Sequence, residues 1–112
     1  MVTKIELDDR IEYRNEKRKF HREDGPAIEY SDGTKCWYIN GKKHREDGPA
    51  IEYSDGTKEW WINNKCHRED GPAVEWYGGF KWWYLNSKRY SEQQWQDKVI
   101  KIKLQRLKSY GN

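Results

Sequence analysis

The chain has 112 residues, enough for a single domain, but only 34% of them are hydrophobic while 37% are charged. Seven Trp, eight Tyr and two Phe offset this shortage, because each aromatic side chain buries a large area; this argues against a disordered chain and favours an elongated repeat array. The net charge of +3, with both signs mixed along the chain, does not require nucleic acid or a membrane as a partner.

The two cysteines bear on the cellular compartment. Cys36 and Cys66 fall at different positions of the repeat described below, so they do not form a designed pair. No charged segment followed by an apolar one opens the chain, and no apolar run reaches membrane-spanning length. We therefore expect free thiols, a reducing cytoplasmic compartment and no membrane partner.

Residues 1–20 precede the regular part of the chain and look like a degenerate half-repeat. Residues 11–14 have the pattern of a strand, and the polar residues 15–19 that follow suit a long turn. We expect this N-terminal segment to cover the first edge of a sheet, because an exposed edge invites unwanted pairing.

The motif HREDGPA occurs three times, beginning at His21, His44 and His67, with a constant spacing of 23 residues. It divides the chain into repeats 21–43, 44–66 and 67–89. The first and second repeats are identical at 19 of 23 positions, and the second and third at 13 of 23. Tyr90 stands where a fourth His would begin, so the array ends there.

Each repeat has the pattern of a β-hairpin. In the second repeat, residues 50–53 form one predicted strand, Asp55-Gly56 a two-residue turn, and residues 58–62 the return strand. This turn would place Tyr53 opposite Lys58 and Ile51 opposite Trp60. Alternation then predicts one core face made of Ile28, Tyr30, Trp37 and Ile39, then Ile51, Tyr53, Trp60 and Ile62, then Val74, Trp76, Trp83 and Leu85.

The opposite face of the predicted hairpins carries an aromatic ladder. Tyr38, Trp61 and Tyr84 recur every 23 residues, and Trp82 lies beside the last of them. The ladder can be a second, thinner core, or an exposed strip that binds a partner. For the second reading, the predicted binding residues are Tyr38, Trp61, Tyr84 and Trp82, bordered by Arg22, Arg45 and Arg68.

The segment 90–112 changes character and predicts a capping helix. Ser91 and Gln94 have the spacing of a capping box, and the helix should run from about Glu92 to about Lys108. Two neighbouring apolar stripes form a broad face: Trp95, Val99 and Ile102, and Ile100, Leu104 and Leu107. Docking on the last repeat is the first explanation, and a basic amphipathic helix for a membrane surface or a partner groove is the alternative.

His21, His44 and His67 are the residues most suggestive of chemistry, because His, Glu and Asp ligate metals and transfer protons. They recur identically three times, whereas a catalytic site brings different groups together once. Pairing across Asn40-Gly41 would place His44 opposite Trp37, which favours a packing role. We found neither a C-x-x-C pair nor a phosphate-binding glycine loop, so we predict no catalytic residue, no metal and no cofactor.

The string HREDGPAIEYSDGTKEWWINNK resembles the MORN-repeat variants of bacterial and bacteriophage proteins, and the resemblance covers roughly residues 11–100. It implies an antiparallel β array used for interaction, and by analogy a phage origin. In ordinary MORN repeats, the turn continues with spaced glycines, but here Arg45-Glu46-Asp47-Gly48-Pro49 follows. The lipid binding of ordinary MORN proteins is therefore not carried over.

Together these features predict a mainly β, antiparallel hairpin array over residues 1–112 with a C-terminal capping α-helix. We expect a non-enzymatic, protein-binding module: a phage inhibitor of a host defence protein, or an antitoxin-like neutraliser. A nucleotide or single-stranded nucleic-acid binder that stacks bases on its aromatics is a further alternative, disfavoured by Glu29, Glu52, Glu59 and Glu75. Two open sheet edges would also permit a homodimer.

Overall fold

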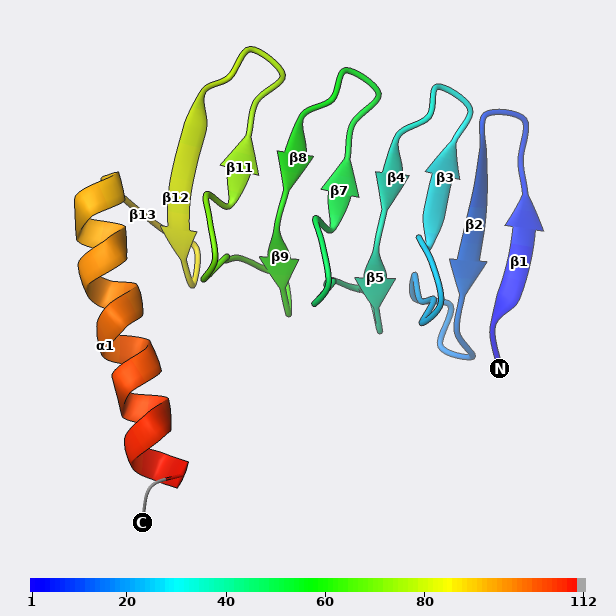
Figure 1. The fold of residues 1–112 in the computed structure, drawn as a ribbon. Helices are drawn as coiled ribbons and strands as arrows, with labels where there is room; N and C mark the ends of the chain where they lie inside the picture. The colour runs from blue at the N-terminus through cyan, green and yellow to red at the C-terminus, as the bar shows by residue number, and fades with distance from the viewer. Residues whose placement is uncertain (111–112) are drawn as a thin grey trace.

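A computed structural model describes residues 1–110 as a flat antiparallel sheet closed at one end by a helix, with extents of 48 × 39 × 18 Å (Figure 1). The fold-class prediction is confirmed. The main sheet has nine strands in the order β1 (Thr3–Glu6), β2 (Arg10–Arg14), β3 (Ile28–Tyr30), β4 (Lys35–Cys36), β7 (Ile51–Glu52), β8 (Lys58–Glu59), β11 (Val74–Glu75), β12 (Lys81–Leu85) and β13 (Lys88–Tyr90). Two short ladders continue the hairpins below it: β5 (Tyr38–Ile39) with β6 (Lys42–Lys43), and β9 (Trp61–Ile62) with β10 (Lys65–Cys66).

The predicted register of the hairpins is wrong by one residue. Tyr53 N donates to Thr57 O at 2.9 Å and Gly56 N to Tyr53 O at 3.0 Å, so the turn has three residues rather than two. Gly56 takes the left-handed conformation, with φ of +96°, that this turn type needs at its last position. Ile51 therefore lies opposite Glu59, rather than opposite Trp60.

The shift of one residue changes which side chains share a face. One core cluster contains Ile28, Cys36 and Ile51, with Tyr38 and Trp61 packed against it. The predicted core is correct for Ile28, Ile51, Val74 and Leu85, which are buried. Ile39 and Ile62, also predicted, are only half-buried. The prediction is wrong for Tyr30, Tyr53 and Trp76, which are exposed at the ends of their strands.

The N-terminal segment contains a full hairpin. β2 adds Arg10 to the predicted strand 11–14, and β1 was not predicted. Ile5 pairs with Glu12, and Ile28 pairs in the same way with Cys36, 23 residues further along. The structure thus has four stacked hairpins, of which the first lacks its own HREDGPA loop.

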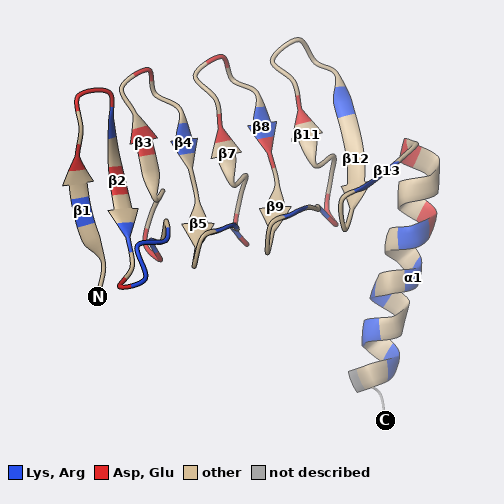
Figure 2. Cartoon of the chain, turned by 180° about the vertical axis from the view of Figure 1, so that it is seen from behind, with Lys and Arg blue, Asp and Glu red and all other residues tan. Residues whose placement is uncertain are grey.

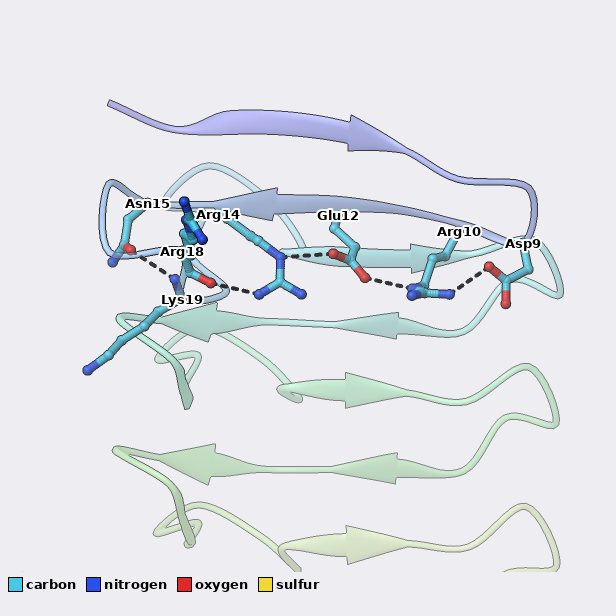
Figure 3. A network of polar contacts seen from close by, with 7 residues as sticks. All are labelled: Asp9, Arg10, Glu12, Arg14, Asn15, Arg18 and Lys19. Carbon is cyan, nitrogen blue, oxygen red and sulfur yellow. Dashed lines mark hydrogen bonds and ion pairs between the residues drawn. The ribbon is translucent and has the colours of Figure 1, made fainter.

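Glu12 takes the buried position that Cys36 has in the next hairpin, and it is only 4% exposed. Arg10 Nε donates to its Oε2 at 2.7 Å and Arg14 Nε to its Oε1 at 2.9 Å (Figure 3). These bonds, with that from Arg10 first, hold the pKa of the Glu12 carboxyl below its ordinary value despite burial. The first hairpin thus has a buried polar network at the position where the next hairpin has the core residue Cys36 and the hairpin after it has the half-buried Glu59.

Helix α1 (Glu92–Tyr110) begins as predicted and ends two residues later than predicted. The capping box is confirmed: Gln94 N donates to Ser91 Oγ at 3.2 Å, and Ser91 N to Gln94 Oε1 at 3.1 Å. Trp95 and Val99 are buried with Leu85, as a cap requires. The last two residues of the predicted cap segment 90–112 lie outside the described residues.

The second apolar stripe of α1, made of Ile100, Leu104 and Leu107, is exposed and contacts no core cluster. Only one of the two predicted stripes therefore docks. Within residues 1–110, no helix combines the length and the apolar character needed to cross a bilayer.

Candidate functional site

The HREDGPA loops hold the array together, and this accounts for the arginines predicted to border a binding surface. The Arg45 guanidinium lies 3.9 Å from the ring centre of Trp37 in the preceding hairpin. Its Nε donates to Asp47 at 3.1 Å and its Nη1 to Glu52 at 2.8 Å, both within its own repeat. Arg22 and Arg68 cover Tyr13 and Trp60 in the same manner, at 4.0 and 3.8 Å.

The glycine of each loop makes room for this arginine. A Cβ at Gly48 would lie 3.0 Å from Arg45 Cζ, and one at Gly71 would lie 2.7 Å from Arg68 Cζ. The acidic partners of these arginines lie in their own repeat and not in a neighbouring one. The arginines link neighbouring hairpins through their aromatic contacts instead.

The three histidines have structural contacts. His44 N donates to Trp37 O at 3.2 Å, which confirms the predicted pairing. Its Nδ1 accepts a hydrogen bond from Asn63 N at 3.0 Å, and His21 and His67 accept from the equivalent asparagines. Among residues 1–110, no three His, Cys, Asp or Glu side chains are grouped so as to hold a metal ion.

The predicted ladder of Tyr38, Trp61 and Tyr84 does line up along the array, but neighbouring hairpins cover it. Tyr38 packs on Phe20 with ring centres 5.3 Å apart, and Lys43 Nζ lies 4.2 Å from the centre of the Trp61 ring. All three aromatics are half-buried against the two clusters of buried core residues. Packing therefore accounts for their recurrence.

Among residues 1–109, the most exposed aromatic side chains lie on the hairpin turn of the third repeat. Tyr77 is 75% exposed and Phe80 is 74% exposed. The turns of the first and second repeats have Ser and Thr at these positions. The backbone of the third repeat's turn is nevertheless the same, since Trp76 N donates to Phe80 O at 2.9 Å and Gly79 has a φ of +95°. These two residues were not among those predicted to bind a partner, although both are substitutions by which the third repeat diverges from the first two.

These side chains continue into a larger aromatic surface. Trp76 contacts Trp82 edge to face, with ring centres 5.2 Å apart, and the Arg89 guanidinium lies 4.2 Å from the Trp82 ring. We call Trp76, Tyr77, Phe80 and Trp82 the aromatic tip. Of the residues predicted to bind a partner, only Trp82 belongs to it.

Beside the tip, charges alternate across the sheet. The row Glu29, Lys35, Glu52, Lys58, Glu75, Lys81 runs over six neighbouring strands in register. Figure 2 shows it as alternating red and blue bands from β3 to β12. Neighbours in the row have opposite signs, so the sheet carries no stripe of a single sign.

Two other features of the chain are a cleft near the N-terminus and a pair of free thiols. An open cleft of about 1180 Å³ near the N-terminus is lined by charges of both signs, including Lys17, Lys19, Glu16 and Glu23. The thiols of Cys36 and Cys66 are free but buried, and burial raises their pKa values to about 11 and about 12. Both thiols are therefore protonated at neutral pH and are poor nucleophiles.

Comparisons with protein-family models, with curated proteins and with solved structures found no match to this chain.

Proposed function

We propose that this chain is a non-enzymatic repeat module that binds another protein through its aromatic tip and, as a phage product, inhibits a host defence protein. The single observation that carries the binding proposal is the pair Tyr77 and Phe80, two large side chains about three-quarters exposed on a hydrogen-bonded turn. The phage setting rests on the resemblance to HREDGPA-type repeats alone. A cytoplasmic location agrees with two free, buried thiols.

The aromatic tip has the composition of a protein-binding hot spot. Trp and Tyr carry much of the binding energy in protein interfaces, and they lose little conformational entropy on binding because they have few rotatable bonds. The backbone below the tip is already held by the same hydrogen bonds as the two polar turns. Binding would therefore require little ordering of the chain.

In this proposal the aromatic tip binds the partner, in place of the ladder and arginines predicted from the sequence. Tyr38, Trp61 and Tyr84 are half-buried, and Arg22, Arg45 and Arg68 are engaged inside the array. An antitoxin-like neutraliser would use the same tip and the same kind of contact. A nucleic-acid binder would also need a continuous positive surface beside its aromatics. Arg89 lies against Trp82, but the neighbouring row of Glu and Lys alternates in sign.

A turn exchange tests the proposal, with the chain's own first two turns as the template. The triple variant Tyr77→Ser, Gly78→Asp, Phe80→Thr gives the third turn the sequence Ser-Asp-Gly-Thr, which already folds twice in this chain. Wild type and variant are used to capture proteins from bacterial lysate, after circular dichroism has confirmed that both are folded. We expect a specific protein to be retained by the wild type and lost with the variant.

The matched control is the exposed helix stripe, changed by Ile100→Ser, Leu104→Ser and Leu107→Ser. It removes as much exposed apolar surface without touching the tip, so capture should persist. If capture is lost with the helix variant and kept with the turn exchange, the aromatic tip is not the binding surface. Material that absorbs at 260 nm and dissociates steeply with salt would instead indicate a nucleic-acid ligand.

A further inference from the structure

The sheet ends with part of one strand edge unpaired. On its outer side, β12 pairs with β13 only at Trp83, Tyr84 and Leu85. Lys81 and Trp82 pair only inward, with Glu75 and Val74. In Figure 1, β13 and α1 lie beside the lower part of β12, and no element of the described chain lies beside its upper part. Trp82 O already accepts a hydrogen bond from Ala73 N at 2.9 Å, so alternation along the strand directs the N–H and C=O of Lys81 outward, toward an incoming strand.

The internal repeats show which kind of strand fits this edge. The equivalent residues of the first repeat, Lys35 and Cys36, pair outward with Glu52 and Ile51 of the next repeat, in antiparallel register. The second repeat does the same, with Lys58 opposite Glu75 and Glu59 opposite Val74. In both cases the neighbouring strand presents a β-branched residue followed by a glutamate.

Charge makes the end of the array different from its interior. Lys35 lies between Glu29 and Glu52, and Lys58 lies between Glu52 and Glu75. Lys81 has Glu75 on one side and no strand on the other. The alternating row thus stops one carboxylate short, at an edge that matches the interior edges at Lys81 and Trp82 and differs from them at Trp83, which pairs with Tyr90.

We propose that the outer edge of Lys81 and Trp82 binds an extended segment of the partner protein as an additional antiparallel strand. A β-branched residue of that segment lies opposite Trp82, and the carboxylate that follows it lies opposite Lys81. The inference rests on the proposed protein-binding function and adds to it the manner of binding, strand addition, and the sequence pattern of the ligand.

The aromatic tip suits this occupant. In the interior, Thr34 Oγ1 accepts a hydrogen bond from Ser54 N at 3.1 Å, and Thr57 Oγ1 one from Tyr77 N at 3.2 Å. Each bond fixes the residues just after the paired glutamate of the next hairpin. Phe80 stands at that threonine position in the last repeat, so it offers the incoming segment an apolar contact instead.

A single segment fits the edge better than a second copy of the chain. β1 also carries an isoleucine–glutamate pair, Ile5 and Glu6, on an edge without an outer partner. A second copy would bring β2 and the loop below it into the region beside β12 that α1 occupies (Figure 1). An isolated strand needs only the upper part of the edge.

The chain supplies its own probe, a synthetic peptide of residues 51–57 with the sequence Ile-Glu-Tyr-Ser-Asp-Gly-Thr, which begins opposite Trp82 and leaves the part of β12 paired with β13 free. It is titrated into the full chain labelled with nitrogen-15, and amide resonances are followed by nuclear magnetic resonance. We expect saturable shifts centred on Phe80, Lys81 and Trp82. Absence of such shifts at millimolar peptide, or shifts on the β1 edge instead, would overturn the proposal.

A charge exchange tests the register. Lys81→Glu should weaken peptide binding about three- to tenfold, because two carboxylates then face each other, and a peptide carrying Glu52→Lys should restore it. Lys58→Glu is the matched control, since it alters an equivalent lysine of the row that borders no open edge. Weakening without restoration by the charge-reversed peptide would reject the register.

Two further readouts separate this inference from the proposed function. If the captured protein depends on Tyr77 and Phe80 but neither its capture nor peptide binding responds to Lys81→Glu, strand addition is wrong and the binding function stands. If the peptide binds as expected but capture survives the turn exchange, the aromatic tip is rejected as the partner surface, and peptide binding at the edge stands independently of it. Self-association in sedimentation that Glu6→Lys abolishes would assign the edge to a second copy and overturn the choice of occupant.

Discussion

The two ends of the array lack a neighbouring hairpin in different ways, and they compensate by different chemistry. At the N-terminal end, the inner strand β2 buries Glu12 between Arg10 and Arg14 where the first repeat has the core residue Cys36. At the C-terminal end, Trp83 has no arginine from a following loop, and Trp95 packs on it with ring centres 4.6 Å apart. One end relies on a polar network and the other on an aromatic contact.

The two ends also differ in how the aromatic ring that recurs in each hairpin is covered. Tyr13, Trp37 and Trp60 are each covered by the arginine of the loop that follows. Trp95 supplies the same coverage from a helix and also donates from Nε1 to Arg68 O at 2.9 Å, so it binds the last loop as well. Trp95 therefore takes the place of the arginine that the loop of a further repeat would supply.

The largest expected effect is at this cap. Trp95→Ala should lower the free energy of unfolding by about 3–5 kcal/mol, because it removes a buried indole and leaves a cavity against Trp83 and Leu85. Urea denaturation measures it, with Ile100→Ala, on the exposed stripe, as the control expected to change stability by less than about 0.5 kcal/mol. Equal effects of the two variants would mean that α1 does not cap the array.

The N-terminal network should respond to pH, whereas the aromatic cap should not. The folded pKa of Glu12 lies below its unfolded value, so its stabilising contribution is present above the unfolded pKa and is lost as pH falls through the folded pKa. Glu12→Gln should cost about 2 kcal/mol at neutral pH, because charged hydrogen bonds to Arg10 and Arg14 are lost. Denaturation at a series of pH values should show a flatter acid limb for the variant; an unchanged limb would contradict this account.

A smaller effect is expected at the outer contact of the helix. Arg106 donates to both carboxylate oxygens of Glu69, at 2.6 and 2.9 Å, and His67 Nε2 lies 2.8 Å from the same group. Glu69→Ala should cost about 0.5–1 kcal/mol, since the Arg106 side chain is largely exposed. Amide hydrogen exchange should rise in the second half of α1, and Glu46→Ala, at the same position of the second repeat, is the control that should leave it unchanged.

Most of the fold could be predicted from the sequence, but the first hairpin could not. The period of 23 residues placed the hairpins, and Ser91 and Gln94 placed the start of α1, because these signals are local. The first hairpin escaped prediction although Ile5 lies 23 residues before Ile28. Its first turn is shorter than the others and its loop 15–19 is longer, so the two changes cancel and hide the strand alignment.

The number of HREDGPA repeats, the hairpin in each, the capping box and the apolar face of the helix can all be predicted from local sequence patterns. The register of the hairpins cannot, because Asp-Gly fits both a two-residue and a three-residue turn and the choice depends on packing across strands. With that register, Tyr38, Trp61 and Tyr84 are half-buried against the core, and Tyr53 and Trp76 lie exposed where their strands end. The tertiary structure also selected the stripe of α1 that docks, since Trp95 must reach Trp83 and the remaining stripe then faces solvent.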